Sequence, residues 1–348
     1  MVGTALDERK KEVLRSLIRL HVATGEPVGS ESLSRVLDRT LSPATLRNIM
    51  ADLEALGYLE HPHTSAGRMP TDEGYRFFVD SLMGRESLAP RDAAAIRSGL
   101  RRGGSSPQQV LSNASQLLSG LSRNVGFVLA PDLGKSSFRH IDFVRLASPR
   151  ILVVMVSRTG IVTNKVIEVE EEVTQDDLQA CANYLNAHFA GMTLTGIRAR
   201  LLELMGEEKA LYDQLLQQVI AVGNRAFAAA EGEADIYLDG TSNILERAEF
   251  EDLERMRELF KTFEEKSRLV RILNACISGQ GVRILIGHEN PEPRMRELSL
   301  VTAAASVEGE ADLGLGVLGS TRMEYAYVVA LVDHVARAIV ETLRELRS

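Results

Sequence analysis

Apolar residues recur at the spacing of amphipathic helices through the first 83 residues of the chain. The pattern predicts helices over residues 7–23, 30–37 and 43–56, and a fourth helix that begins after Thr71. Short runs of glycine, proline and polar residues separate these segments and indicate the turns between them. We therefore expect residues 1–83 to form a small N-terminal domain that is mostly helical.

The third of these helices has the clearest boundaries. Ser42 is a favoured N-cap, Pro43 fits the first helical position, and Gly57 can end the helix in the left-handed conformation. Two short runs, at Leu59 and at Arg68, then flank a polar tip, which indicates a hairpin. A helix-turn-helix followed by a hairpin is the winged form of this DNA-binding motif, in which the second helix enters the major groove.

The polar face of the third helix carries side chains suited to DNA. Arg47 can donate two hydrogen bonds to guanine, Asn48 can pair with adenine, and Thr45 lies beside them. Serines near the helix starts and residues of the wing are candidates for phosphate or minor-groove contacts. The expected DNA-binding residues are Ser30, Ser42, Thr45, Arg47, Asn48, His63, Thr64, Ser65 and Arg68. The alternative is a small domain in which they are merely solvated surface residues.

From residue 84 onward the pattern alternates between helical and strand-like segments. Helical spacing over 91–102 and 108–122 predicts two helices, which we assign to a helical linker of residues 84–122. Four strand-like segments follow within residues 125–169, separated by turn residues as in antiparallel sheets. Residues 174–230 then return to helical spacing.

The last third of the chain mixes strands and helices again. Strand-like segments at 236–238 and within 282–318 enclose a predicted long helix over 250–277, and a closing helix covers 323–346. Strands, a helical block and strands again indicate a helical insertion within one domain of the α+β class. We expect the first part of that domain at 123–172, the inserted helical domain at 173–232 and the second part at 233–348.

Composition is that of an ordinary soluble protein. Of the 348 residues, 45% are hydrophobic and 25% are charged, with no apolar run long enough to cross a bilayer and no secretory signal. We therefore expect a cytoplasmic protein that does not enter membranes. Cys181 and Cys276 lie far apart on apolar helical faces, which favours two buried free thiols over a disulfide or a metal site.

The net charge of −8 bears on how the chain could bind DNA. Within residues 1–85, 11 Lys and Arg stand against 12 Asp and Glu. A protein that binds phosphates without regard to sequence would be clearly basic. We therefore expect sequence-specific binding, with the few basic side chains gathered on one face.

Other residues that could carry chemistry each have a structural alternative. His61 and His63 lack further metal ligands nearby, and His288–Asn290 is better explained as a turn after a strand. The glycines of Gly314–Gly319 spell a dinucleotide-type pattern, but without a βαβ unit they are better explained by close packing of a strand. No nucleophile–base motif accompanies these residues. We expect no enzyme activity, no metal and no cofactor.

Three motifs, Thr24–Ser34 (TGEPVGSESLS), Leu41–Asp80 (beginning LSPATLRNIM) and Gly316–Val328 (GVLGSTRMEYAYV), resemble the HrcA family of heat-inducible transcription repressors. The similarity runs in the same order from about Leu6 to the C-terminal helix. The chain departs from the residues usual in the family at Glu31, Pro43, Ile49, Ala305 and Ser320.

The resemblance implies both a fold and a function. HrcA-like proteins combine a winged helix-turn-helix domain, a GAF-like domain and an inserted helical dimerisation domain. By resemblance, the chain would act as a homodimer that represses chaperone genes from an inverted-repeat operator in double-stranded DNA. A GroEL-type chaperonin would be its regulatory partner. The alternative is a transcription regulator that senses a metabolite through the GAF-like domain.

Overall fold

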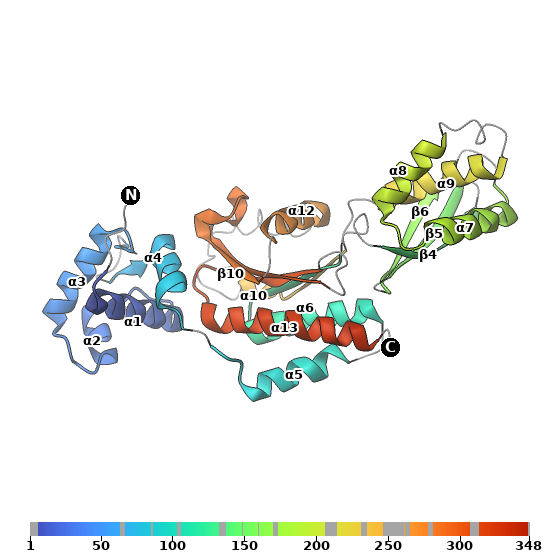
Figure 1. Ribbon diagram of the computed structural model, residues 1–348. Coiled ribbons are helices and arrows are strands. Elements are labelled where there is room, and N and C mark those ends of the chain that lie inside the picture. Colours follow the sequence, from blue (N-terminus) through green and yellow to red (C-terminus); the bar gives the residue numbers. More distant parts are fainter. Residues whose placement is uncertain are drawn as a thin grey trace.

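The computed structural model describes residues 6–62, 67–84, 86–102, 106–131, 137–147, 149–158, 160–169, 173–205, 214–230, 235–245, 261, 265–277, 281–306 and 313–346. These residues form an N-terminal helical unit, a central unit on a five-stranded sheet and a third unit on a three-stranded sheet. Figure 1 shows the three units in a row, with the central unit in the middle. The strands pair antiparallel, which agrees with the expected α+β class.

The N-terminal unit follows the helical pattern of its sequence. Its elements are α1 (Glu8–Thr24), α2 (Ser30–Val36), α3 (Pro43–Ala55), β1 (Leu59–Glu60), β2 (Met69–Pro70), α4 (Asp72–Phe77) and the π-helical turn η1 (Phe78–Leu82). Asp7, Ser42 and Thr71 cap α1, α3 and α4 by accepting a backbone N–H bond. The helices bury a shared core that includes Leu17 and Leu46. This is the predicted winged helix-turn-helix.

The central unit is a sheet with helices on both faces. The strands β3 (Val125–Leu129), β7 (Ile236–Asp239), β8 (Val282–Ile286), β9 (Leu298–Ala305) and β10 (Leu313–Ser320) lie in the order β7-β3-β10-β9-β8. The helices α5 (Pro90–Leu100), α6 (Pro107–Ser122) and α13 (Tyr325–Glu345) lie on one side of the sheet, and α12 (Lys266–Cys276) lies on the other (Figure 1). Short elements complete the unit: α10 (Ser242–Leu245), η4 (Gly287–Glu289) and η5 (Pro293–Met295).

Successive side chains of a strand point to opposite faces of the central sheet, which explains why helices pack on both faces. In β3, Phe127 and Leu129 belong to the core under α12, while Val128 belongs to the core that contains α6 and α13. Gly126 allows α6 to lie close to β3, because a Cβ there would collide with the carbonyl of Ser115. The three inner strands β3, β10 and β9 are therefore buried on both faces and read as nearly continuous apolar runs, while the edge strands β7 and β8 are only partly buried.

The third unit has a core of its own. Strands β4 (Phe138–Ala147), β5 (Arg150–Ser157) and β6 (Val162–Glu168) form a sheet in that order, with α7 (Gln175–Phe189), α8 (Leu194–Met205) and α9 (Gln214–Ala230) packed against one face. Phe143, Val153 and Leu185 are among the buried residues between sheet and helices. The unit enters and leaves the central sheet at adjacent points, since Ala130 N–H donates to the carbonyl of Asp235 at 2.8 Å.

The structure differs here from the division expected from the sequence. The expected boundary at residue 173 assigned the strands of 125–169 to the central domain and only helices to the insertion. In the structure β3 alone joins the central sheet, and β4–β6 form a second sheet with α7–α9. The reason is physical, because one face of β4–β6 is apolar and the helices that can bury it follow directly in the sequence.

The remaining predicted elements are found close to their expected positions. The closing helix is α13, while the predicted helix over 250–277 lies partly outside the described residues and ends as α12. Cys181 and Cys276 are buried free thiols, as expected. Of the helices described, none is long and apolar enough to cross a membrane.

Candidate nucleic-acid interface

Helix α3 starts at a well-defined cap. Ser42 has extended backbone angles, and its Oγ accepts from the backbone N–H of Thr45 at 3.2 Å. The Oγ of Ser42 also lies 2.9 Å from the Oγ1 of Thr45. Pro43 follows at the first helical position, where no N–H is needed. The two hydroxyls fix the start of α3 next to its polar face.

That polar face carries Arg47 and Asn48, which are exposed, while Leu46 and Ile49 on the opposite face are buried. The Nε of Arg47 donates to the Oγ of Ser30 at the start of α2, at 3.3 Å. Ser30 is only 9% exposed, so this hydroxyl belongs to the packed helix-turn-helix. This hydrogen bond holds the Nε of the Arg47 guanidinium and leaves its two terminal nitrogens for other acceptors. This contact places Ser30 beside Arg47 on the face that carries Asn48.

The turn between α2 and α3 is tightly bonded. Asp38 and Arg39 both have left-handed backbone angles, with φ of 49° and 57°. The N–H of Arg39 donates to the carbonyl of Ser34 at 2.8 Å, and the Oγ of Ser34 donates to the carbonyl of Leu41 at 2.9 Å. Left-handed angles are unfavourable for residues with a Cβ. The hydrogen bonds of the turn hold Asp38 and Arg39 in this conformation and thereby set the angle between α2 and α3.

The wing is tied to both helices beside it. Glu60 pairs with Met69 across β1 and β2, and Arg68 exchanges backbone hydrogen bonds of 2.9 and 3.0 Å with Val28 before α2. The Nε of Arg68 donates to the Oε2 of Glu54 on α3 at 2.7 Å. The guanidinium of Arg68 thus braces the wing against α3, a contact that the sequence did not predict. His63, Thr64 and Ser65, the expected wing contacts, lie outside the described residues.

The charges on the helix-turn-helix suit an anionic ligand better than the net charge suggests. The first turn of α3 holds no acidic residue, so no carboxylate offsets the partial positive charge of the helix N-terminus. Arg35, Arg39 and Arg47 are exposed on α2, on the turn and on α3. Glu31, in the first turn of α2, opposes them. The acidic excess of the unit is therefore not concentrated at the start of α3.

The other sequence candidates contribute to structure. The side-chain amide of Asn290 donates to the carbonyls of Gly287 and Leu298 at 2.9 and 2.7 Å, which makes His288–Asn290 a bonded turn. Gly316 lies where a Cβ would collide with the carbonyl of Val301, as expected of close strand packing. Across the ranges that the structure describes, no three His, Cys, Asp or Glu residues gather to hold a metal ion.

Comparisons with known proteins identify both halves of this architecture. Residues 5–81 match the family model of the winged helix-turn-helix transcription repressor, HrcA DNA-binding, and residues 108–329 match that of the HrcA protein C-terminal domain. The chain belongs to the HrcA family. The heat-inducible transcription repressor HrcA of Geobacter sulfurreducens is 43% identical to it over 337 residues, which cover 97% of this chain and 98% of the relative.

Other HrcA relatives agree with this assignment, and one solved structure shares the fold. The heat-inducible transcription repressor HrcA of Syntrophobacter fumaroxidans is 37% identical, with 98% of each chain covered. That of Brucella canis is 40% identical over 98% of this chain and 97% of the relative. A crystal structure of a hypothetical protein at 2.2 Å resolution has the same fold, with a TM-score of 0.62 and 19% identity over 98% of this chain and 100% of that chain.

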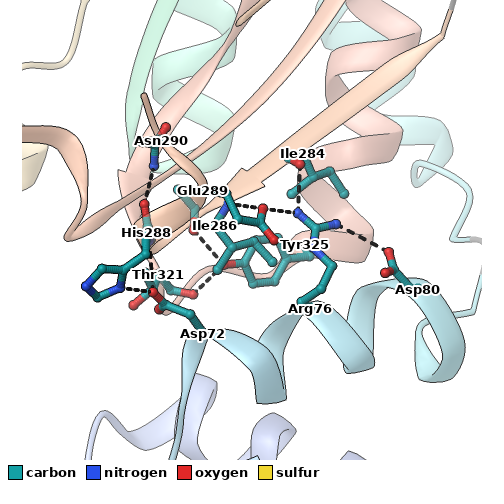
Figure 2. Close-up of polar contacts among 12 residues, drawn as sticks. Asp72, Arg76, Asp80, Ile284, Ile286, His288, Glu289, Asn290, Thr321 and Tyr325 are labelled. Atoms are coloured by element: carbon teal, nitrogen blue, oxygen red, sulfur yellow. Dashed lines mark hydrogen bonds and ion pairs between the residues drawn. The ribbon is translucent and has the colours of Figure 1, made fainter. Parts of the chain in front are cut away.

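A second group of polar residues joins the winged helix to the central unit of this HrcA chain (Figure 2). Arg76 on α4 pairs with both carboxylate oxygens of Glu289, with Nε to Oε1 at 2.7 Å, and donates to the carbonyl of Ile284 at 2.8 Å. Asp72 accepts from the backbone N–H and the Nδ1 of His288 at 2.9 and 2.7 Å. No local signal in the sequence predicts this group, because its halves are separated by more than 200 positions.

Proposed function

We propose that this protein represses heat-shock genes by binding an inverted-repeat operator in double-stranded DNA as a homodimer. Each α3 would lie in the major groove of one half-site, with Arg47 and Asn48 on base edges and Thr45 and Ser42 near the backbone. The family assignment supports the repressor role. The observation that carries the proposal is the exposed Arg47–Asn48 pair at the start of α3, with Arg47 oriented by Ser30.

Binding to such an operator is tested by fluorescence anisotropy at several stated salt concentrations, because phosphate contacts make affinity depend on salt. Arg47→Ala and Asn48→Ala should each weaken binding by about 1–3 kcal/mol, and Arg47→Ala should relax base preference at one position of each half-site. Arg101→Ala is the matched control, since Arg101 is an exposed arginine just after α5 that pairs with Glu345 far from α3. Full affinity in both α3 variants would refute the placement of the recognition helix.

We place the dimer contact on the outer face of β4–β6. One face of this sheet is buried under α7–α9, and the other face also carries apolar side chains. Val144, Leu152 and Val166 lie in one cross-strand row on it, and Val144 and Val166 are 44% and 53% exposed. A second copy of the chain fits because an inverted repeat needs a two-fold symmetric protein, which an isologous contact of this face provides.

Charges placed on this face test the dimer contact. Leu152→Glu and Val166→Lys should yield monomers by light scattering that bind a full operator no better than a half-site. Leu202→Glu, at an exposed leucine on α8, is the control. Dimers that persist in both sheet variants would locate the contact elsewhere.

Regulation by a GroEL-type chaperonin completes the proposal. Protein stability exceeds zero by only a small margin, so mild heating can depopulate the DNA-binding form. Purified protein that has been heated and cooled should recover operator binding poorly alone and well with chaperonin and ATP, as measured by gel shift. Complete spontaneous recovery that chaperonin does not change would remove this part of the proposal and leave DNA binding intact.

One observation favours a second candidate, regulation by a metabolite. A cavity of about 560 Å³ lies between α1 and the start of α13, lined by apolar residues such as Ile18, Phe78 and Met323 and by the charged side chains of Arg19 and Glu324. This size is within the range of small-molecule sites. A metabolite screen by thermal shift, followed by operator binding with each stabilising compound, separates this function from control by chaperonin alone.

A further inference from the structure

The contact between the winged helix and the central unit is specific on both sides. Asp72 and Arg76 lie one helical turn apart on α4, so the carboxylate of Asp72 and the guanidinium of Arg76 both face the central unit. Opposite them, His288 and Glu289 are consecutive residues of η4 at the end of β8. We name this set of four residues the α4–η4 contact, and Figure 2 shows its side chains, with Asp72 and Arg76 rising from the helix at the bottom of the view.

Both halves of the α4–η4 contact are held by further contacts. Glu289 also accepts from the backbone N–H of Ile286 at 2.8 Å, which fixes its carboxylate on the turn. Gly287 has φ of 52°, and a Cβ there would collide with the carboxylate of Asp72. Next to the contact, the rings of Tyr75 and Tyr325 lie 5.9 Å apart, and the buried Tyr325 hydroxyl donates to the carbonyl of Thr321 at 2.6 Å. Burial raises the pKa of Tyr325, so this ring stays neutral.

A short path links the α4–η4 contact to the recognition helix. Thr71, the cap of α4, donates from its Oγ1 to the carbonyl of Gly57 at 2.6 Å, just after α3. Its backbone N–H donates to the carbonyl of Tyr58 at 3.1 Å. A rotation of α4 about the central unit therefore carries α3 and Arg47 with it. In a dimer, two such helices must reach half-sites that are separated by about 34–36 Å or a multiple of it.

We propose that the α4–η4 contact sets the orientation of the winged helix on the central unit, and with it the half-site spacing that the dimer accepts. Arg76 and Glu289 are positioning residues in this sense, because they act on DNA only through α3. The inference rests on the proposed dimeric repressor. It adds that affinity for a half-site does not depend on the contact, whereas affinity for a correctly spaced operator does.

The test compares the full-length protein with Arg76→Glu, Glu289→Arg and the double variant that exchanges the two charges. Each is titrated with a single half-site and with inverted repeats whose centre-to-centre spacing is changed in steps of one or two base pairs. The Arg76→Glu and Glu289→Arg proteins should bind the half-site within about twofold of the original affinity. They should lose about tenfold or more on the preferred full site, since avidity disappears when geometry prevents simultaneous binding.

The same two single variants should also respond less to spacing, and the charge-exchanged double variant should regain much of the preference. Arg337→Glu is the matched control, because Arg337 forms an exposed pair with Asp333 on α13. An unchanged spacing preference in both single variants would overturn the inference, and so would a higher affinity for the full site. Glu289→Arg leaves the winged helix unaltered, so a changed preference in that variant cannot come from unfolding of the DNA-binding unit. Failure of the unmutated protein to bind any site would instead refute the proposed function.

Discussion

Arg68 at the base of the wing donates from its Nε to the carboxylate of Glu54 on the recognition helix at a distance of 2.7 Å. The two side chains are 20% and 35% exposed, so the pair is partly shielded from water. The sequence suggested a phosphate contact for Arg68. The geometry instead favours a role in holding the wing against α3, and the two roles predict different measurements.

If Arg68 braces the wing, Glu54→Ala should weaken operator binding in the same way as Arg68→Ala. Neither change should alter the dependence of affinity on salt, because no phosphate contact is lost. The coupling free energy of the pair in a double-mutant cycle should be about 0.5–1 kcal/mol of unfolding free energy. If Arg68 contacts phosphate, only Arg68→Ala should weaken binding, and the salt slope should fall by about 1. Anisotropy titrations at several salt concentrations distinguish the two roles.

The turn between α2 and α3 offers a stabilising substitution. Arg39 has φ of 57°, a conformation that glycine adopts without the Cβ penalty. Arg39→Gly should therefore raise the free energy of unfolding of the winged helix by about 0.5–1 kcal/mol, as measured by urea denaturation, because the Cβ penalty that it relieves exceeds the extra chain entropy that glycine loses on folding. Arg35→Gly is the control, since Arg35 lies in the last turn of α2, where glycine destabilises. A loss of stability on Arg39→Gly would show that the side chain of Arg39 contributes more than its backbone strain costs.

Local signals in the sequence were enough for the N-terminal unit. The cap at Ser42, the proline after it and the apolar spacing from Leu46 to Leu53 each depend on neighbours within a few positions, and all three were confirmed. Contacts between distant segments gave no such signal. The apolar pattern around Phe143 would fit a strand of the central sheet as well as a strand of the three-stranded sheet. Only the packing of α7 against this strand shows that it belongs to the three-stranded sheet. The ion pair of Arg76 with Glu289 likewise joins two residues that are far apart in the sequence.

The two cysteines provide separate reporters of heat-induced opening. Cys181 lies in the core of the third unit and Cys276 in the core beneath α12. Burial raises the pKa of Cys181 to about 11 and also raises that of Cys276, so both remain neutral thiols in the folded protein. At pH 8 and low temperature, neither should react with iodoacetamide, and peptide mass spectrometry after stepwise heating shows which unit opens first.

The raised thiol pKa of Cys181 also predicts a dependence of stability on pH. An unfolded thiol ionises near its ordinary pKa of 9.0, whereas burial raises the pKa of the folded Cys181 thiol to about 11. The unfolded state therefore binds fewer protons in this interval, and stability should fall as pH rises from about 9 to about 11. Cys181→Ser should reduce that fall in urea denaturation. An identical decline in Cys181→Ser would attribute it to other groups, such as Tyr327, whose pKa is raised to about 12 by burial and Asp92.

The point at which the third unit leaves the central sheet predicts how the chain can be shortened. Because Ala130 and Asp235 are hydrogen-bonded neighbours, and β3 pairs directly with β7, joining Pro131 to Asp235 through a short glycine-serine linker should preserve the central sheet. The resulting protein, without residues 132–234, should be a folded monomer. It should bind a half-site with the affinity of the full chain and gain nothing from a second half-site.

Removing only the helices should have a different result. A deletion of Thr174–Ala230 follows the boundary that the sequence suggested, but it leaves β4–β6 without the helices that cover Phe143 and Val153. An exposed apolar sheet face of this kind promotes association. We expect this variant to aggregate in light scattering while the 132–234 deletion stays monodisperse. A 132–234 deletion that remains dimeric would place the dimer contact outside the third unit, and one that fails to fold would show that the central sheet depends on it.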